Sequence, residues 1–287
     1  MKKCAFLSMD NLEAFECYDN LLVEPLAKAG WLAEEVSWHN NKVNWADYNV
    51  VIIRSTWDYQ DDPDSFLQTL EKIAQQTQLE NSLNIVDWNI HKTYLIDLEL
   101  NGIDIVPTLW GENLTKGNLL PAFERLNVNE IIIKPVISAN ADFTYRLNKE
   151  QLVKQENQLI KIFKNNSYMI QPFMYNIVSE GEYSLFYFGG EYSHCILKTP
   201  KETDFRVQEE HGGILELVEP EALLLEEGRK AIAAIGEKLL YARVDFVRTE
   251  PDKFALMELE LIEPSLYFNM DPDSPKRFID AFLKRMN

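Results

Sequence analysis

Residues 241–264 read YARVDFVRTEPDKFALMELELIEP and predict two neighbouring strands. The first strand carries Asp245, and the second brings Glu258 and Glu260, two positions apart. Residues two apart on a strand project from one face, so the two glutamates lie together while Leu259 takes the opposite face. Adjacent carboxylates repel each other unless a cation lies between them, and Mg²⁺ often binds one or two carboxylates plus substrate phosphates. The stretch therefore predicts a metal site on a packed strand; a solvent-facing edge with unpaired acids is the alternative.

The net charge narrows the class of partner. The 287 residues include 46 Asp and Glu against 28 Lys and Arg, a formal charge of −18. A surface field of this sign repels phosphates, so we expect no binding to nucleic acid or to membranes. Three widely spaced cysteines suggest neither a disulfide framework nor a thiolate metal site. With no apolar run near the ~18 residues that span a bilayer, the composition predicts a soluble, cytoplasmic protein.

The first ninety residues alternate between strand and helix patterns. Residues 5–7 and 50–53 form apolar runs typical of buried strands, and Asp62 before Pro63 marks the start of a helix. This order favours an open parallel sheet covered on both faces. We expect an N-terminal α/β substrate domain over residues 1–88.

Two further units follow in the predicted organisation. Residues 89–170 form a central lid with a helix at 91–100, a short strand at 103–106 and a strand at 131–135. Residues 171–287 form the C-terminal unit that carries the metal site. Its predicted elements are a hairpin of 182–188 and 191–198, a helix at about 221–240, the two strands quoted above and a last helix from Ser274.

Cationic side chains stand at the ends of several predicted elements: Lys92, Lys134, Lys198 and Arg206. Taken singly, each is typical of a solvated surface charge. Together with a Mg²⁺ site in an acidic protein, they would complete a site for a nucleoside triphosphate.

These residues resemble the ATP-grasp ligases, in the branch of ribosomal-protein glutamate ligases and glutathione synthetases, over most of residues 85–265. The resemblance implies an α/β (α+β) ATP-grasp fold, in which two α+β subdomains clasp ATP behind the N-terminal domain. It implies metal ligation by Asp245, Glu258 and Glu260 and catalytic roles for Lys198 and Arg206. It also implies ATP binding by Lys92, Lys134, Gln171, Pro172, Phe173, Glu182, Lys198, Arg206 and Gln208.

Two positions depart from the pattern of that family. After Lys134, where the family usually has a glycine-rich loop over the phosphates, residues 137–146 contain no glycine. The usual Glu-x-Asn metal pair is Glu258-x-Glu260 here. An extra carboxylate strengthens cation binding in principle but changes how a second metal would be held.

A narrower resemblance covers both departures. The string RSTWDY at 54–59, the glycine-free loop ending in Thr144-Tyr145-Arg146, and MELELIEP at 257–264 are similar to the D-cycloserine-forming O-ureido-D-serine cyclo-ligases and their relatives. The resemblance implies substrate contacts by Arg54, Thr56, Tyr145 and Arg146, and the fork of an arginine suits a substrate carboxylate. The alternative is that Trp57 and Tyr59 pack the core while Arg54 pairs with Asp58.

The implied activity is that of an ATP-dependent, ADP-forming carboxylate–amine ligase with ATP as cosubstrate and Mg²⁺ or Mn²⁺ as metal. We expect a small amino-acid-like carboxylate as substrate, activated as an acyl phosphate and joined to a nitrogen nucleophile. Ring closure within one molecule and addition to a second substrate, as in a peptide- or glutamate-adding ligase, both stay open, as does a homodimer. A catalytically inert ATP-binding regulatory module is the alternative from another class.

Overall fold

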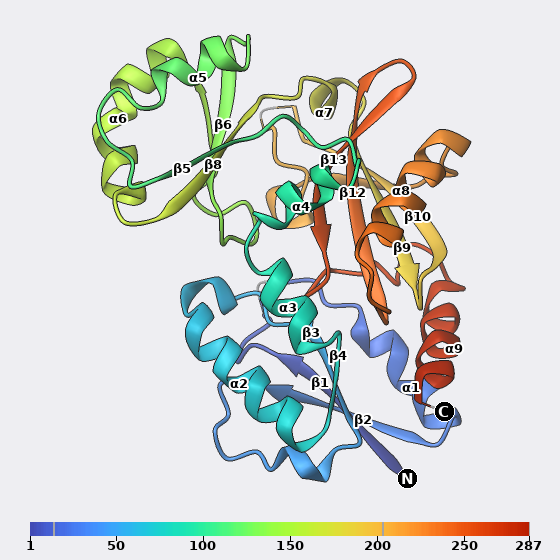
Figure 1. Ribbon diagram of the computed structural model, residues 1–287. Helices are drawn as coiled ribbons and strands as arrows, with labels where there is room; N and C mark the ends of the chain where they lie inside the picture. Colours follow the sequence, from blue (N-terminus) through green and yellow to red (C-terminus); the bar gives the residue numbers. More distant parts are fainter. Residues whose placement is uncertain (14, 203, 287) are drawn as a thin grey trace.

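The computed structural model describes residues 1–13, 15–202 and 204–286, which build three sheets and their covering helices (Figure 1). The N-terminal sheet is parallel with the order β2-β1-β3-β4. Its strands are β1 (Lys2–Ser8), β2 (Trp31–Ser37), β3 (Val50–Ser55) and β4 (Gln78–Glu80). This is the open parallel sheet that the alternating pattern predicts.

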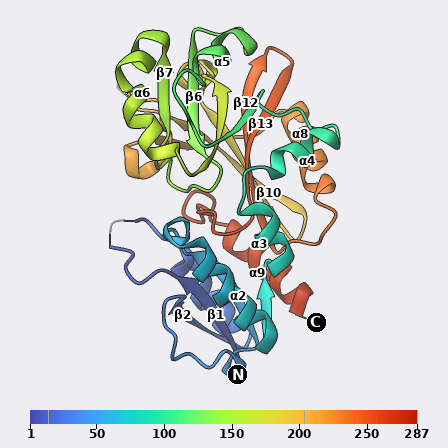
Figure 2. The same ribbon diagram turned by 60° about the vertical axis from the view of Figure 1, so that its left-hand side comes forward.

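Alternating side chains explain why helices cover both faces of the N-terminal sheet. Cys4 and Phe6 pack with residues of α1 (Val23–Lys28) and α9 (Ser274–Met286), whereas Ala5 and Leu7 pack on the opposite side. That side is covered by α2 (Pro63–Gln76) and α3 (Leu83–Asn89), which Figure 2 shows in front of the strands. Asp62 caps α2 by accepting a hydrogen bond from the Ser65 backbone N–H, as the sequence predicts. The short 3₁₀ helices of this part are η1 (Asp19–Leu22), η2 (Trp45–Asp47) and η3 (Tyr59–Asp61).

The central sheet is antiparallel with the order β5-β8-β6-β7. Ile131 and Ile133 of β6 pack beneath the covering helices, so Ile132 and Lys134 point to the other face. Asn148 forms a capping box at the start of α6. The elements are β5 (Leu109–Glu112), α5 (Leu120–Arg125), β6 (Glu130–Pro135), β7 (Tyr145–Asn148), α6 (Lys149–Phe163) and β8 (Ser167–Pro172).

The C-terminal sheet is antiparallel with the order β11-β10-β9-β12-β13. Gly189 and Gly190 turn the predicted hairpin, both with positive φ, which glycine adopts without a steric penalty. The elements are α7 (Asn176–Ser179), β9 (Glu182–Phe188), β10 (Glu191–Thr199), η4 (Glu209–His211), β11 (Ile214–Leu217), α8 (Ala222–Ala234), β12 (Tyr241–Glu250) and β13 (Lys253–Glu260).

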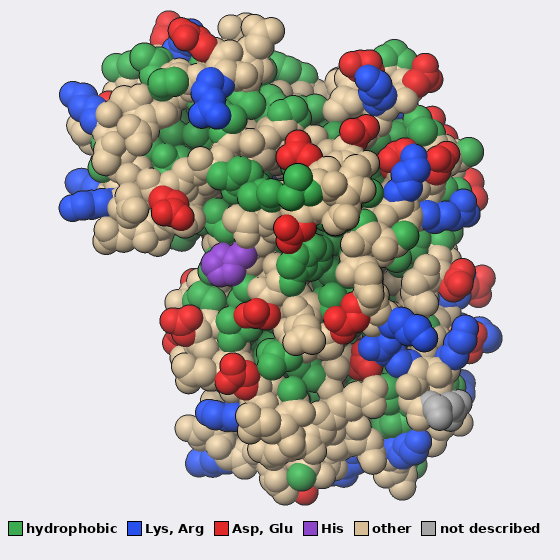
Figure 3. All heavy atoms as spheres, in the orientation of Figure 1, with side chains coloured by type: hydrophobic (Ala, Val, Ile, Leu, Met, Phe, Trp, Pro, Cys, Tyr) green, Lys and Arg blue, Asp and Glu red, His purple; other side chains and the backbone are tan. Residues whose placement is uncertain are grey.

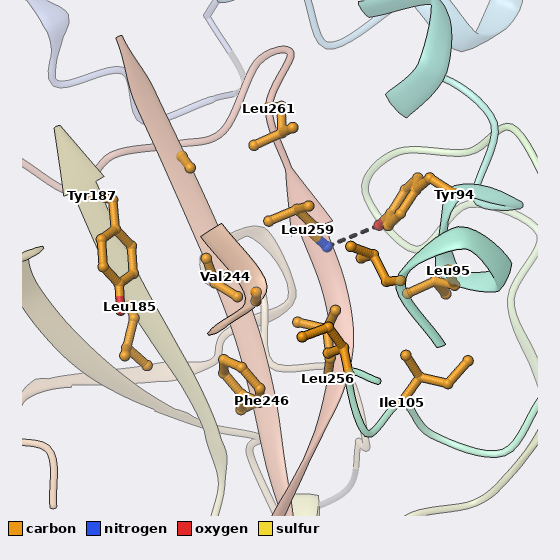
Figure 4. Close-up of a cluster of buried hydrophobic side chains, with 14 of the residues drawn as sticks. Tyr94, Leu95, Ile105, Leu185, Tyr187, Val244, Phe246, Leu256, Leu259 and Leu261 are labelled. Atoms are coloured by element: carbon orange, nitrogen blue, oxygen red, sulfur yellow. Dashed lines mark hydrogen bonds between the residues drawn. The ribbon is translucent and has the colours of Figure 1, made fainter. Parts of the chain in front are cut away.

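One face of the C-terminal sheet packs against α4 (Tyr94–Leu100) and the chain that follows it (Figure 4). Tyr94 and Leu95 lie beside Leu256 and Leu259 of β13, and the Leu259 backbone N–H donates to the Tyr94 hydroxyl at 2.8 Å. Residues 83–106 thus lie against the C-terminal sheet, and the boundaries at residues 88 and 170 stay a prediction.

The sequence analysis is wrong on three local points. The predicted helix 91–100 begins only at Tyr94, and the predicted strand 103–106 makes a single bridge, Ile105 to Leu256. The predicted helix 221–240 ends at Ala234, because Gly236 adopts a left-handed conformation that terminates it.

Two buried asparagines fasten the N-terminal part to the C-terminal sheet. Asn81 donates to the carbonyls of Tyr241 and Leu261 at 3.0 and 2.8 Å, and it accepts from the Leu240 N–H at 2.8 Å. Asn89 donates to the Leu259 carbonyl and accepts from the Leu261 N–H, at 2.9 and 3.0 Å. These amides satisfy backbone groups that burial would otherwise leave unpaired.

The surface carries charges of both signs. On the face shown in Figure 3, acidic and basic side chains are interspersed, and the surface is hollowed between the upper lobe and the N-terminal part. In the described ranges, no helix has the length and apolar character needed to cross a membrane.

Candidate active site

A cavity lies between the central sheet and the C-terminal sheet, and side chains from the N-terminal part close one end of it. The structure brings eleven of the predicted site residues to this cavity: Lys92, Lys134, Gln171, Pro172, Phe173, Glu182, Lys198, Arg206, Gln208, Glu258 and Glu260. These residues come from positions 92 to 260 of the chain, so the convergence is a property of the fold rather than of any local motif.

The register of β12 and β13 explains why charged side chains gather here. Asp245 pairs directly with Glu258, and Arg243 pairs with Glu260. Residues two apart on each strand share a face, so all four side chains fall on one side of the sheet. On the neighbouring strands, Lys198 lies opposite Glu182 in the same manner.

Ion pairs link these groups into one network. Lys92 pairs with Glu258, and Arg243 pairs with Glu260. Arg243 also donates through Nε to the two carboxylate oxygens of Asp245 at 3.2 and 3.1 Å. Lys198 pairs with Glu182 and lies 3.6 Å from Asp245.

The predicted metal ligands do not all face the cavity. Glu258 and Glu260 line it, whereas Asp245 is 2% exposed and lies behind them, held by Arg243 and by the hydroxyl of Ser184. Among the residues that the structure describes, no three acids, histidines or cysteines form a metal-binding group, since basic side chains pair with the carboxylates. The donor set still fits Mg²⁺, because it consists of hard carboxylate oxygens on one face of a buried strand pair.

Burial and neighbouring charges separate the pKa values of the cavity acids. Burial opposes ionisation of Glu258, but the charges of Lys92 and Lys134 hold its pKa at about 2. Burial raises the pKa of Glu260 to about 7 despite Arg243. Burial and the charge of Glu260 raise the pKa of Glu263 to about 8. Carboxylates with divergent pKa values in one cavity are typical of functional sites.

The other end of the cavity suits a flat, mostly apolar group. Val106, Ile132, Phe173, Met174 and Ile177 line it. Beside them, the side chain of Gln171 donates to the Thr108 hydroxyl at 3.0 Å. Lys134 stands between this end and the carboxylates; it forms no ion pair within the described ranges, and burial lowers its pKa.

Loops from all three parts of the chain meet over the cavity. Asn140, from the glycine-free loop, donates to the Trp57 carbonyl at 3.4 Å, and its own carbonyl lies 3.3 Å from Nε2 of His211. Arg206 forms a two-pronged pair with Asp204, which holds the pKa of that carboxyl well below its usual range. The expected glycine-rich loop is replaced by a backbone in which Asn140, Ala141 and Phe143 take positive φ.

The four predicted substrate contacts lie outside this cavity. Arg54 is 1% exposed and pairs with Asp19 at 3.0 Å instead of Asp58, and it donates to the Pro264 carbonyl at 3.1 Å. Residues 50 and 52 face α1 and α9, so position 54 on the same face points toward that side. Thr56 is fully buried, and its hydroxyl has no partner in the described part of the chain.

Tyr145 and Arg146 belong to the central sheet instead. Tyr145 packs edge-on against Phe163, and Arg146 pairs with Glu130 at 2.7 Å while its guanidinium covers the ring of Phe173 at 3.6 Å. Arg146 therefore meets the cavity wall through the Phe173 ring and through Ile132, its partner on β6, without lining the cavity itself.

Sequence reasoning missed several lining residues. Trp57 and Tyr59 face the cavity, so they are more than core packing, and Arg243 and Glu263 carry charges into it. The signal for Arg243 was present, because it stands two residues before Asp245 on the same strand face. No comparable signal marks Glu263, whose position depends on the turn after β13.

The parallel N-terminal sheet and the two antiparallel sheets that enclose the cation-lined cavity have the arrangement of the ATP-grasp fold, and solved ATP-grasp structures match the chain over nearly its whole length. Residues 4–81 match the model of the D-cycloserine synthetase DcsG N-terminal domain family. The chain is 27% identical to the cycloserine biosynthesis protein DcsG of Streptomyces lavendulae over 290 residues, 92% of both proteins.

Two solved structures extend the comparison. The crystal structure of D-cycloserine synthetase DcsG matches with a TM-score of 0.87 at 24% identity, covering 99% of this chain and all of the other. D-alanine–D-alanine ligase from Bacillus anthracis, complexed with ATP, matches with a TM-score of 0.73 at 16% identity, covering 100% and 97%. The expected fold class is thereby confirmed.

Proposed function

We propose that this ligase uses ATP and Mg²⁺ to activate the carboxylate of a small amino-acid-like substrate as an acyl phosphate, which an amine of the same molecule then attacks to close a ring. One observation carries the proposal: Lys92, Lys134 and Lys198 converge with Glu258 and Glu260 in a single cavity. The similarity to DcsG over 92% of the chain favours ring closure over addition to a second substrate.

ATP would occupy the cavity with its base at the apolar end. Phe173 and Ile132 offer flat apolar contacts there, and Glu182 would accept from the ribose. Lys134, whose ammonium has no acidic partner in the described ranges, would bind phosphate oxygens.

The metal would be held by Glu258 and Glu260, with Asp245 as a further donor behind them. When bound, Mg²⁺, or Mn²⁺ in its place, would neutralise charge on the phosphates. To hold the metal, Glu258 and Glu260 would have to give up part of their pairing with Lys92 and Arg243, and both cations would then be available to anionic substrate groups.

The reaction then needs little covalent chemistry from the protein. A substrate carboxylate oxygen bonds to the γ-phosphorus while the bond from that phosphorus to the β-phosphate bridge breaks, releasing ADP. The amine nitrogen next attacks the acyl carbon, phosphate departs, and the amine loses a proton. Lys198, Arg206 and Arg243 would stabilise the negative charge that develops on oxygen in both steps.

The meeting of three loops over the cavity serves this chemistry. An acyl phosphate must be kept from water, and the contacts of Asn140 with Trp57 and His211 join the lid loop to both other parts of the chain. Closure of the lid loop would therefore be coupled to the N-terminal part through Trp57 and to the C-terminal part through His211.

The test is ADP release from MgATP with O-ureido-D-serine, D-alanine and a panel of other amino acids, with hydroxylamine added to trap an acyl phosphate as a hydroxamate. We expect ADP and hydroxamate only with a substrate acid, and neither in the Glu258→Gln variant. Glu216→Gln, an exposed acid on β11, is the matched control.

The opposite result has a clear meaning. Binding of Mg²⁺ and AMP-PNP without ADP release from any acid would favour the inert ATP-binding module. Light scattering of the purified protein tests the expected homodimer separately.

A further inference from the structure

Glu263 is a buried acid of the cavity whose carboxylate accepts a hydrogen bond from its own backbone N–H but has no basic partner in the described part of the chain. It is 8% exposed, yet no side chain in the described ranges hydrogen-bonds to or forms an ion pair with its carboxylate. Glu182, which is buried, and Glu258 and Glu260, which are half-buried, each pair with a lysine or an arginine. Burying an unpaired carboxylate is costly, so a free acid facing a cavity points to a cationic ligand.

Two aromatic residues of the N-terminal part line the cavity together with Glu263. The Trp57 indole N–H donates to the backbone carbonyl of Glu263 at 2.8 Å, which ties the ring to the backbone of this residue. Tyr59 also lines the cavity, and Glu263 is the charged group that acts most strongly on its hydroxyl.

This end of the cavity lies apart from the unpaired cation. Lys134 enters the cavity from β6 of the central sheet, whereas Glu263 follows β13 and its backbone is bonded to Trp57 of the N-terminal part. The cavity thus has a cationic place for phosphate, a row of paired charges in the middle, and an anionic, aromatic place at the N-terminal end.

We propose that Glu263, Trp57 and Tyr59 form a subsite for the α-ammonium group of the substrate, which is not the nitrogen that closes the ring, with Glu263 as its counter-ion and the aromatic rings as its walls. A carboxylate with neighbouring ring faces is the chemistry that recognises an alkylammonium. The inference deepens the proposed function, on which it rests: it specifies an amino acid rather than a simple carboxylic acid. A hydroxyl or an acetylated amine at the same place would leave Glu263 without its counter-charge.

The experiment compares wild type with Glu263→Gln, which keeps the volume and removes the charge. For the amino acid that best promotes ADP release, we expect the KM to rise roughly ten- to hundredfold in Glu263→Gln, with the KM for ATP unchanged. Glu263→Asp should recover part of the loss. Tyr59→Phe, which keeps the ring, should have a smaller effect, and Glu216→Gln should match wild type.

A second experiment measures ligand binding by thermal shift, so it tests the ammonium subsite without requiring turnover. With Mg²⁺ and AMP-PNP present, the amino acids of the panel should raise the thermal midpoint of wild type, whereas their α-hydroxy and N-acetyl counterparts should not. This selectivity should disappear in Glu263→Gln. The AMP-PNP shift itself should persist, which shows that the variant is folded.

Two results would overturn the subsite: an unchanged KM for the amino acid in Glu263→Gln, or equal binding of amino and α-hydroxy acids by wild type. Failure of the proposed function is seen differently, as absence of ADP release with every acid; amino-selective binding that depends on Glu263 would still support the subsite in that case.

Discussion

Two buried charge clusters in this chain differ in what surrounds them. Arg54 and Asp19 form a pair enclosed by protein, with the Tyr241 ring 5.1 Å from the guanidinium carbon. The cavity cluster is larger and faces open space, and its members include Lys134 and Glu263, which have no opposite charge paired with them in the described part. Both clusters are held by strands that end near the same region of the molecule.

This comparison of the two clusters shows that a buried arginine at the end of a strand does not by itself indicate a ligand site. Arg54 already has Asp19 and the Pro264 carbonyl as partners, so a substrate carboxylate would have to displace them. In the cavity, by contrast, a nucleotide and an amino acid would supply the missing opposite charges. We therefore expect substitutions in the first cluster to act on stability and those in the second to act on function.

The largest expected effect is that of Glu258→Gln on turnover. Losing this predicted metal ligand should lower kcat by about a thousandfold, close to 4 kcal/mol of transition-state stabilisation. The amide has almost the same volume, so the far-UV circular dichroism spectrum should match wild type. Steady-state ADP release measures the effect, and full activity would remove Glu258 from the site.

Arg54→Met should lower stability and leave nucleotide binding unchanged. Removing the guanidinium leaves Asp19 buried without a counter-ion, which should lower the free energy of unfolding by roughly 3 kcal/mol. Urea denaturation measures the loss, and the affinity for MgAMP-PNP should stay at the wild-type value. The double variant Arg54→Met/Asp19→Asn should regain part of the stability; a selective loss of substrate binding in Arg54→Met would break the comparison.

Lys134→Ala should weaken nucleotide binding. Its ammonium would be lost as a charged donor to phosphate, worth about 2 kcal/mol or roughly thirtyfold in Kd. Calorimetric titration with MgAMP-PNP tests this, with Lys116→Ala, an exposed lysine of the same lobe, as the control. Equal affinities for Lys134→Ala and wild type would contradict the phosphate role.

The raised pKa of Glu263 predicts a pH dependence of stability. Burial lifts its pKa from 4.5 to about 8, so the folded state holds a proton that the unfolded state releases between these values. The stabilisation is complete below pH 4.5 and is lost as the pH rises through about 8. Between about pH 6 and about pH 8.5, wild type should lose about 1–2 kcal/mol more than Glu263→Gln in urea denaturation. Parallel pH profiles would show that the group does not titrate in this range.

The smallest expected effect concerns the lid loop. Ala141 has a φ of 57°, a conformation that costs an L-residue roughly 1 kcal/mol and costs glycine almost nothing. Ala141→Gly should therefore raise the thermal midpoint. The rise should be small, because glycine also increases the conformational entropy of the unfolded chain. A marked fall in the midpoint would mean that the alanine methyl group contributes packing.

The sequence predicts the strands better than it predicts their surroundings. Period-two alternation in residues 241–260 identifies both the strand pair and the shared face of Glu258 and Glu260, because that information is local. Which face of the N-terminal sheet Arg54 would meet depends on how α1 and the C-terminal part pack, and no local pattern carries it. The same limit hid Glu263, which lies in the turn after β13, where its backbone carbonyl accepts a hydrogen bond from Trp57.

The asparagine contacts between the N-terminal part and the C-terminal sheet limit how the N-terminal domain can be replaced by that of a relative. The DcsG N-terminal family match ends at Asn81, and this side chain is bonded to the backbone of residues 240, 241 and 261. A chimera that splices in a foreign N-terminal domain up to residue 81 would thus have to bring an amide that meets the same three groups. Chimeras between relatives should fold more often when the junction is placed after Asn89. The inserted N-terminal segment then includes both Asn81 and Asn89.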